Sequence, residues 1–470
     1  MHLVQSRPRH ICLVKLLSAA HKLWTPKGKS VSKATFITAL ARSITCGEWS
    51  KESIKQRLTF ALSPSTLDTE RLASSIHKKT KKLKNIENTH VENAMRETKF
   101  LNEWLEKQTS LPRVMRINLQ PSVMNKNTSP FQISNIPEIT THYGLARWLS
   151  LTENDLSWMA DTHNLHAQTK NFKLQHYHYK WLTRKSAPPR LLETPKSCLK
   201  SVQRKILHDL IDKITPHNAA HGFTKNRSCK THAQIHCEQD IILHMDLSNF
   251  FTTITYGQVY WFFLSLGYPK KIARTLASLC TNTPSPYLLG RNFQKLSWQN
   301  QKIITQAHLP QGAPTSPALA NLVCYKLDNR LEGLSTSLGI NYSRYADDLA
   351  FSSNNSSLKK SAHFRKMVEQ IADDQGFQIN HNKTYTSTKS QQQSLVGIVV
   401  NKQPNIRRDD YDQIKAILHN CIKKGASSQN IGKHKNFKEH LRGKIAYIAS
   451  INPSKAQKLK KEYQKINWNK

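Results

Sequence analysis

Short apolar runs in the second half of the chain stand directly beside acidic residues. The run Ile241–Met245 ends at Asp246, and residues 341–352 place aromatic and aliphatic side chains on both sides of Asp347 and Asp348. An apolar run that stops at a carboxylate and a polar break predicts a buried strand with the acid at its end. Two such runs around a tight connection predict a β-hairpin with the acidic pair at its tip.

Elsewhere the apolar positions recur mainly at intervals of three and four residues, which is the helical spacing. This spacing predicts helical segments at residues 66–109, 143–149, 156–160 and 402–470, and one continuous helix over residues 258–280. Aromatic and aliphatic runs predict strands at residues 176–181 and 395–401. Residues 111–137 contain Pro, Asn and Ser without any period, and we expect a linker there.

The charge balance indicates the class of partner. The 470 residues include 70 Lys and Arg against 31 Asp and Glu, which gives a formal charge of +39. A surplus of this size is typical of proteins that bind a polyanion. No apolar run approaches the roughly 20 residues that a membrane-spanning helix needs. We therefore expect nucleic acid, and no membrane, as the partner of a chain long enough for a catalytic core and a further domain.

The apolar run at residues 11–20 follows Arg7 and Arg9, as in a secretory signal. Lys15 interrupts this run, however, and no clear cleavage site follows it. We expect an amphipathic first helix and a cytoplasmic protein, whose eight cysteines remain reduced.

Cys229, His232, His236 and Cys237 are potential zinc ligands within one short segment. Structural zinc sites usually draw their ligands from two separated pairs. The spacing of the two histidines instead fits successive turns of one helix. We favour a metal-free helix here over a zinc site.

The carboxylates of Asp246, Asp347 and Asp348 form a ligand set that suits Mg²⁺. A lone acidic pair at a turn is commonly only solvated, but here a third acid accompanies the pair. Neighbouring carboxylates repel each other unless a divalent cation neutralises them. Mg²⁺ prefers a few carboxylates together with substrate phosphates. Because two such ions can activate the attacking oxygen and stabilise the leaving group, the pattern predicts a two-metal site for phosphoryl transfer.

The motifs, taken in this order, resemble those of reverse transcriptases. Tyr345–Asp348 resembles their catalytic box, Asp246–Phe251 their first-aspartate motif, and Leu309–Asn321 the loop and helix that line the nucleotide pocket. The matching region is similar to bacterial retron-type enzymes. This resemblance implies a right-hand polymerase fold of the α/β (α+β) class, with fingers, palm, a helical thumb and an additional helical N-terminal extension.

The resemblance and the composition together set the expected domains. These are a basic helical N-terminal extension at residues 1–110, a linker at 111–137, fingers and palm at 138–402, and an RNA-binding thumb at 403–470. Leu395–Gly397 stands where retron-type enzymes usually carry Val-Thr-Gly, a difference that bears on the subfamily and not on the chemistry.

The resemblance also implies roles for single residues. Asp246, Asp347 and Asp348 would be catalytic and would hold two Mg²⁺, or Mn²⁺ as a substitute, together with the backbone carbonyl of Leu247. The expected nucleotide-binding residues are Arg190, Phe251, Gln311, Gly312 and Lys383. The expected RNA-binding residues are Lys196, Arg204, Arg407, Arg408, Arg442 and Lys444.

Physical reasons accompany several of these roles. A planar guanidinium at Arg190 can pair with phosphate oxygens, and a ring at Phe251 can exclude a 2′-hydroxyl as a sugar gate. Lys383 would act as a general acid near the departing pyrophosphate. Because neighbours on a strand face opposite sides, we expect Phe250 in the core. Ser316 is expected to cap the helix that follows the pocket loop.

By resemblance, the chain would be the RNA-directed DNA polymerase of a retron. It would use dNTPs to copy part of a cognate structured non-coding RNA, which serves as template and primer from an internal 2′-hydroxyl, into branched multicopy single-stranded DNA, and would hold the RNA–DNA hybrid. The expected biology is antiphage defence, together with an effector or toxin protein. Alternatives are a group II intron enzyme, a defence polymerase that needs no external template, and a non-catalytic RNA-binding scaffold.

Overall fold

The structure, a computed structural model, divides the chain into two compact units, Met1–Pro121 and Ser122–Lys470. The residues that it describes are 32–45, 49–62, 65–81, 83, 86–112, 114, 123–125, 129–133, 135–184, 187–354, 358 and 361–468. The division falls within the predicted linker at 111–137, and the predicted first helix at 11–20 lies outside the described residues. None of the helices in these ranges combines the length and the apolar character that crossing a membrane requires.

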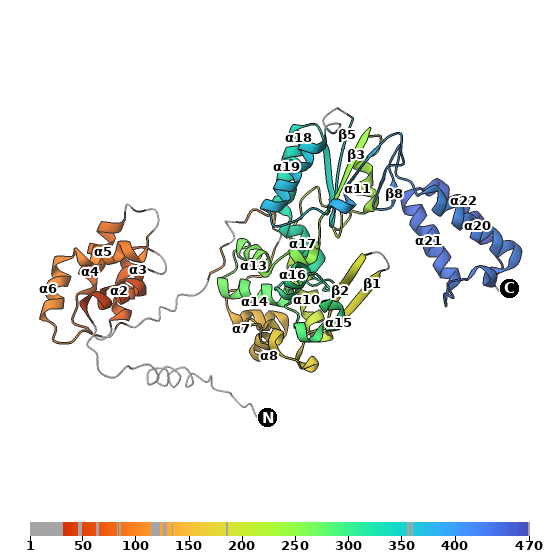
Figure 1. Ribbon diagram of the computed structural model, residues 1–470. Coiled ribbons are helices and arrows are strands. Elements are labelled where there is room, and N and C mark those ends of the chain that lie inside the picture. Colours follow the sequence, from red (N-terminus) through yellow and green to blue (C-terminus); the bar gives the residue numbers. More distant parts are fainter. Residues whose placement is uncertain are drawn as a thin grey trace, which may run out of the picture. The chain divides into compact units, whose positions relative to one another are not determined.

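The first unit consists of helices joined by short connections (Figure 1). Its described helices are α2 (Lys33–Ile44), α3 (Lys51–Ala61), α4 (Thr69–Thr80), α5 (Asn88–Arg96) and α6 (Lys99–Lys107). Their apolar faces form one buried core, which includes Phe36 and Leu72. Ser32 and Ser50 cap α2 and α3 by accepting a backbone N–H of the first turn. In the described part of residues 66–109 the predicted helical character is confirmed, and it is divided among α4, α5 and α6.

The second unit contains an antiparallel sheet with the strand order β4–β5–β3–β6. Its strands are β3 (Ile241–Asp246), β4 (Asn341–Tyr345), β5 (Asp348–Ser353) and β6 (Tyr385–Thr388). Every residue of β3 is buried, and β4 and β5 pair as a hairpin. The buried strand and the hairpin at the acidic pair are therefore confirmed.

Helices cover this sheet and fill the core beside it (Figure 1). Helices α11 (Cys229–Ile235) and α18 (Tyr325–Ser337) both contact β4, and α19 (Ser361–Asp374) contacts α18. A 3₁₀ turn, η6 (His381–Lys383), precedes β6 and contacts β3. The main core cluster includes apolar residues from all three long strands, namely Ile241, Leu243 and Met245 of β3, Tyr342 of β4, and Leu349 and Phe351 of β5. Close packing of this kind holds the ends of the strands rigidly.

A second β-hairpin precedes the sheet in the chain. Strands β1 (Tyr177–Arg184) and β2 (Ala187–Pro195) pair antiparallel and lead into helix α10 (Ser197–Asp209). The flanking elements are α7 (His142–Leu149), α8 (Glu153–Ala160), α9 (Leu165–Gln168), η2 (Phe172–Leu174) and η3 (Ile211–Lys213). The predicted strand at 176–181 and the predicted helices at 143–149 and 156–160 are confirmed to within a few residues.

The single helix predicted over residues 258–280 is wrong. This segment forms two helices, α13 (Tyr256–Ser265) and α14 (Lys270–Cys280). Gly267 between them has a φ of 92°, and Pro269 immediately precedes α14. A left-handed glycine commonly ends a helix and a proline cannot continue one, so these two residues divide an otherwise continuous apolar pattern.

Short helices connect these elements. They are α12 (Phe250–Thr253) after β3, then η4 (Pro286–Leu288), α15 (Gly290–Gln294), α16 (Trp298–Thr305) and α17 (Ser316–Val323) between α14 and α18. Asn249 Nδ2 donates a hydrogen bond of 3.2 Å to Asn300 Oδ1 and so ties α16 to the end of β3.

Residues 395–401 do not form one buried strand, as the pattern predicted. The apolar run is a tight hairpin of β7 (Ser394–Leu395) and β8 (Ile398–Val399). Val396 and Gly397 connect the strands with φ angles of 48° and 78°. Two consecutive residues with positive φ make the two-residue turn that fits the twist of a hairpin, so the run turns back on itself.

The C-terminal segment is helical, which confirms the prediction for residues 402–470. Its elements are α20 (Arg408–Lys424), η7 (Ala426–Gln429), α21 (Phe437–Ile451) and α22 (Pro453–Gln464). Leu418, Ile448 and Leu459, one from each long helix, belong to a buried cluster that also includes Ile242 of β3. This cluster attaches the helices to the sheet.

Candidate active site

The three aspartates predicted to be catalytic lie at the ends of two neighbouring strands. Asp246 is the last residue of β3 and pairs directly with Asp348, the first residue of β5. Residues that oppose each other in an antiparallel pair point to the same face, with Cβ atoms about 5 Å apart. Asp347 precedes β5 in the turn, and its carbonyl accepts a hydrogen bond of 2.9 Å from the amide of Leu247. The structure thus brings the predicted acidic residues together.

The turn before the acidic pair is held in an unusual conformation. Ala346 has a φ of 58°, in the left-handed region that residues other than glycine rarely adopt. Its carbonyl accepts a hydrogen bond of 3.1 Å from Arg344 Nη1. Gly222 packs so closely that a Cβ on it would stand 2.7 Å from the Ala346 amide nitrogen. These contacts hold the turn, and with it the position of the acidic pair.

The electrostatics of the site reflect its accumulated negative charge. Burial, followed by the charges of Asp348 and Asp246, raises the pKa of Asp347 above its ordinary value. The nearby Lys383 acts in the opposite direction but does not cancel this effect. A carboxylate whose ionised form is disfavoured by its neighbours gains from the arrival of a cation.

Lys383 lies directly beside the first aspartate. Its Nζ is 2.7 Å from Asp246 Oδ1, and Asn380 Nδ2 donates to Asp246 Oδ2 at 3.1 Å. Asp246 itself is almost fully buried, whereas the Lys383 side chain is 55% exposed. The structure therefore gives Lys383 a partner within the site, and its role at the pyrophosphate stays a prediction.

His244 is a residue of this site that the sequence reasoning missed. Its Nε2 donates to Asp348 Oδ1 at 3.0 Å and its Nδ1 to the carbonyl of Lys383 at 3.2 Å, while the ring stacks on Tyr385 with 4.8 Å between centroids. Burial alone would lower the pKa of His244, but Asp348 and the Lys383 carbonyl raise it above the ordinary value. Its position two residues before Asp246, on the same face of the strand, was the available signal.

The chemistry of the donors fits the predicted metal. In the described part of the chain, no three His, Cys, Asp or Glu side chains are already arranged around a metal position. The three aspartates are nevertheless hard oxygen donors, and their mutual repulsion is visible at Asp347. Lys383 and His244 each neutralise one of the other two carboxylates. The role of the Leu247 carbonyl as a ligand stays a prediction.

Phe250 and Phe251 differ in exposure, as predicted, but not for the predicted reason. Strand β3 ends at Asp246, and both rings belong to the short helix α12, which begins directly after Asn249 with its φ of 51°. Phe250 is buried against Phe377, which confirms its place in the core. Phe251 is only half-buried and lies between the rings of Phe250 and Phe223. Its role as a sugar gate stays a prediction.

The loop that contains Gln311 and Gly312 lies against strand β2. The Gln311 carbonyl accepts a hydrogen bond of 2.9 Å from the amide of Glu193. A Cβ on Gly312, whose φ is 134°, would stand 2.9 Å from the Glu193 carbonyl oxygen. The predicted cap at Ser316 is wrong, because its hydroxyl donates to the Pro310 carbonyl at 2.7 Å and the cap position of α17 is the preceding residue.

The predicted phosphate and RNA contacts lie on exposed or half-exposed positions. Arg190 is exposed on β2, opposite Leu182, and Lys196 Nζ donates to the carbonyls of Phe172 and Lys173. The other predicted RNA-binding residues are on α10 and at or in the C-terminal helices, and all of them are exposed: Arg204, Arg407, Arg408, Arg442 and Lys444. Arg407, Arg408 and Arg442 each have a nearby acidic partner. Exposed pairs of this kind are weak and can exchange for phosphate.

The histidines of the Cys/His segment support the hairpin. His232 Nδ1 lies 2.7 Å and His236 Nε2 lies 2.8 Å from the Ser343 hydroxyl, and His236 Nδ1 lies 2.7 Å from the Ser352 hydroxyl. Both rings are fully buried, and burial lowers the pKa of His236 to about 3. His232 lies in α11 and His236 directly follows it, which agrees with the predicted helix. These neutral rings connect α11 to β4 and β5.

Arg344 is a second residue whose importance the sequence reasoning missed. Its Nε and Nη2 donate to the two oxygens of Asp328 at 2.8 and 2.6 Å, and Tyr342 also donates to Asp328 at 2.8 Å. Arg344 and Asp328 are both fully buried. A charged residue inside an apolar strand was the signal, but its partner on α18 could not be read from the spacing.

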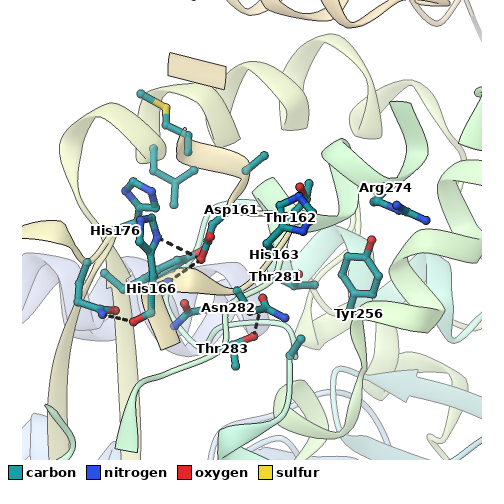
Figure 2. Close-up of a pocket in the computed structure, with 18 residues that line it drawn as sticks. Asp161, Thr162, His163, His166, His176, Tyr256, Arg274, Thr281, Asn282 and Thr283 are labelled. Carbon is teal, nitrogen blue, oxygen red and sulfur yellow. Dashed lines mark hydrogen bonds and ion pairs between the residues drawn. The ribbon is translucent and has the colours of Figure 1, made fainter. Parts of the chain in front are cut away.

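A separate pocket of about 370 Å³ lies between α8, α14 and the start of β1. Figure 2 shows Asp161, His166 and His176 grouped on one side of it and Tyr256 and Arg274 on the other. None of the predicted site residues lines this pocket. It is therefore distinct from the aspartate site.

Comparison with known proteins agrees with this geometry. Residues 184–400 match the family described as reverse transcriptase (RNA-dependent DNA polymerase). The match spans β2, the sheet strands and the Gln311–Gly312 loop. A domain of this family implies the polymerase fold, which agrees with the mixture of helices and antiparallel sheet.

Individual relatives narrow the family. The chain is 33% identical over 294 residues to the retron Mx65 reverse transcriptase of Myxococcus xanthus, covering 61% of this chain and 64% of that protein. It is 30% identical over 342 residues to the retron Mx162 enzyme of the same organism, covering 69% and 66%. It is 32% identical over 297 residues to the retron Ec86 reverse transcriptase of Escherichia coli, covering 61% and 82%. The chain thus spans slightly less than two thirds of the two Myxococcus relatives. By its motifs, its fold and these relatives, the chain belongs to the retron reverse transcriptases.

Proposed function

We propose that this protein is an RNA-directed DNA polymerase in which Asp246, Asp347 and Asp348 are the catalytic carboxylates. The observation that carries the proposal is the register of the sheet, which sets Asp246 opposite Asp348 and leaves Asp347 in the adjoining turn. Membership in the retron reverse transcriptases supports the same activity.

The three aspartates would hold two Mg²⁺, with Mn²⁺ as a substitute and the Leu247 carbonyl as a further ligand. When bound, such ions activate the attacking hydroxyl and stabilise the charge that develops on the transferred phosphate. The residues around them have their own tasks. His244 orients the Asp348 carboxylate, and Lys383 with Asn380 orients that of Asp246.

The incoming dNTP would bind beside the junction at which the hairpin β1–β2 meets the loop that begins at Gln311. Arg190 is exposed on β2, so its guanidinium is accessible to phosphate oxygens. Gly312 lets the loop approach β2 closely. Phe251, half-buried in α12, would exclude the 2′-hydroxyl of a ribonucleotide.

The polyanionic partner would be a cognate structured non-coding RNA, serving as both template and primer. The formal charge of +39 and the exposed cations at Arg204, Arg407, Arg408, Arg442 and Lys444 support this choice. The relatives are named as retron enzymes. On this basis the product would be branched multicopy single-stranded DNA, made in the cytoplasm and used in antiphage defence together with an effector protein.

Two measurements test the proposal. The purified protein should extend a primer on an RNA template with dNTPs and Mg²⁺, whereas Asp246→Asn should bind the RNA equally well and make no DNA. Nucleic acid that copurifies from cells should contain single-stranded DNA joined to RNA. Because the DNA would be joined to a 2′-hydroxyl, this junction should resist nucleases that cleave only ordinary 3′–5′ linkages. Copurifying RNA without any DNA, from a protein inactive on every template, would favour the non-catalytic scaffold.

A further inference from the structure

A buried acid–imidazole pair lies behind the Gln311–Gly312 loop, and none of the roles proposed above uses it. Glu193 of β2 and His308 are both fully buried, and Glu193 Oε1 lies 2.7 Å from His308 Nε2. The second carboxylate oxygen accepts a hydrogen bond of 2.6 Å from Nδ2 of Asn282, a residue labelled in Figure 2. Both oxygens are therefore engaged by residues from outside the β1–β2 hairpin.

The hydrogen bonds of His308 define its charge. Its Nδ1 lies 2.7 Å from the carbonyl of Gln306, so both ring nitrogens face oxygen acceptors and both must carry hydrogen. Burial alone would lower the pKa of His308, but Glu193 raises it above the ordinary value. The pair is thus an imidazolium facing a carboxylate. Removing His308 would leave the Glu193 carboxylate buried without compensation, which is strongly unfavourable, and removing Glu193 would take away the charge that keeps His308 protonated.

The main chain of Glu193 holds the same loop at a second point. Its amide donates to the Gln311 carbonyl at 2.9 Å, and its carbonyl oxygen packs where a Cβ on Gly312 would stand. The side chain therefore fixes the residue just before the loop, and the backbone fixes the loop itself. The loop cannot shift along β2 without breaking one of these attachments.

Strand β2 also carries the residue proposed to meet the phosphates. Arg190 lies three residues before Glu193, and side chains alternate along a strand. This agrees with an exposed Arg190 and a buried Glu193 on opposite faces. The buried face therefore sets where Arg190 stands relative to Gln311. A misplacement of about 1 Å in such an arrangement can cost about 10²-fold in rate or binding.

We propose that Glu193, His308 and Asn282 are positioning residues that hold strand β2 and the Gln311–Gly312 loop at the spacing needed to bind the incoming deoxynucleoside triphosphate. The inference rests on the proposed polymerase function. None of the three residues touches the substrate. Their loss should therefore weaken nucleotide binding much more than it changes template–primer binding or the rate at saturating nucleotide.

Three variants test the network by steady-state primer extension. His308→Gln leaves the Glu193 carboxylate buried without its cation, and Glu193→Gln removes the charge that keeps His308 protonated, whereas the double variant replaces the ionic pair with two neutral amides. Each single change should raise the KM for dNTP by about tenfold or more and change kcat by less than about threefold. The double variant should recover part of the loss, because neither buried charge is left alone.

His217→Gln is the matched control. His217 is also buried and lies 3.5 Å from Glu332, in a pair that does not reach the loop. It should lower thermal stability without moving the KM for dNTP. If Glu193→Gln and His308→Gln behave in the same way as this control, the network is only structural and the proposal is wrong.

Two further readouts keep the outcomes distinct. If a charge variant does not fold, Asn282→Ala, which removes only the hydrogen bonds that Nδ2 donates to Glu193 and to the Tyr179 hydroxyl, should still raise the KM for dNTP. An unchanged KM would overturn the proposal. The rise in melting temperature on adding dNTP measures nucleotide binding without turnover, and it should be smaller in each variant than in the wild type. A wild-type protein that extends no primer would count against the polymerase function, whereas an active wild type with unaltered variants would count against the network alone.

Discussion

Two polar groups lie next to each other along the β4–β5 hairpin, and their charges are balanced to different degrees. In the inner group, Arg344 meets both oxygens of Asp328, which also accepts a hydrogen bond from Tyr342, and all three side chains are buried. In the acidic group, at the turn, Asp347 faces the negative charges of Asp246 and Asp348.

The difference separates structure from chemistry. A buried pair in which every donor and acceptor is matched becomes costly when one member is removed. A group of like charges instead disfavours its own ionised state and is stabilised when a cation binds. The inner group therefore holds the turn through the Arg344 contact with the Ala346 carbonyl, and the acidic group is left available for catalysis.

The largest expected effect follows from removing one charge of the acidic group. Asp347→Asn should lower primer extension by about 10³-fold or more, since a ligand at a phosphoryl-transfer centre is lost. The melting temperature should stay equal or rise, because the pKa of Asp347 is raised by burial and by its acidic neighbours, and an amide removes that repulsion. Extension assays and thermal melting of the same preparation measure both effects.

RNA binding provides the control for this variant and should not change, because the basic surface is untouched. Extension near the wild-type rate would remove Asp347 from the chemistry. A melting temperature that falls by many degrees would instead assign Asp347 to the same structural class as Arg344.

Breaking the inner group should lower stability, which removing one charge of the acidic group should not do. Arg344→Met leaves Asp328 buried without its cation and should destabilise the second unit by about 3–5 kcal/mol. Urea unfolding measures this change. Arg330→Met is the matched control, since Arg330 pairs with Asp374 at 2.8 Å but is 41% exposed, and such an exposed pair contributes little to stability. Equal losses in the two variants would contradict the distinction drawn between the groups.

The same contrast explains how much the sequence could predict. The buried strand, the hairpin and the three aspartates followed from local patterns, because each depends on a few consecutive residues. The roles of Arg344 and His244 did not follow, because their partners lie in other elements of the fold. Contacts between side chains that are far apart in the sequence produce no periodic pattern along the chain.

The incorrect secondary-structure predictions have a similar cause. A continuous apolar pattern suggested one helix over 258–280 and one strand over 395–401, but left-handed residues at Gly267 and at Val396–Gly397 interrupt each of them. Most of the apolar side chains are buried or half-buried in both cases, so the pattern predicted burial correctly at these positions. The pattern could not predict where the backbone turns between the buried side chains.

The two neighbouring phenylalanines repeat the contrast on a smaller scale. Phe250 is buried in the core, whereas Phe251 is half-buried between the rings of Phe250 and Phe223. Phe251→Ala should reduce discrimination of dATP over ATP by about tenfold to a hundredfold, since only steric exclusion rejects the 2′-hydroxyl. Competitive incorporation measures this ratio. Phe250→Ala should instead lower stability, and unchanged discrimination in an active Phe251→Ala protein would make Phe251 another core residue.

The smallest expected effect concerns the neutral histidines that support the hairpin from α11. Burial lowers the pKa of His236 to about 3, while a histidine in the unfolded chain has a pKa near 6.5. Between these values the unfolded state binds a proton that the folded state does not. Stability is therefore complete above about pH 6.5 and falls as the pH falls, by up to about 1.4 kcal/mol per pH unit for one such group.

His236→Gln should remove this contribution to the pH dependence of stability while keeping a polar side chain between Ser343 and Ser352. Its free energy of unfolding should be lower at neutral pH but should fall less steeply between about pH 6.5 and 5, by about 1 kcal/mol per unit. Urea unfolding at several pH values gives both slopes, and the exposed His178→Gln serves as the control that should follow the wild type. Parallel slopes for His236→Gln and the wild type would mean that His236 is protonated in the folded protein. In that case a residue that supports the hairpin would itself be charged. The hairpin would then carry a further buried charge besides the balanced Arg344–Asp328 pair and the acidic group.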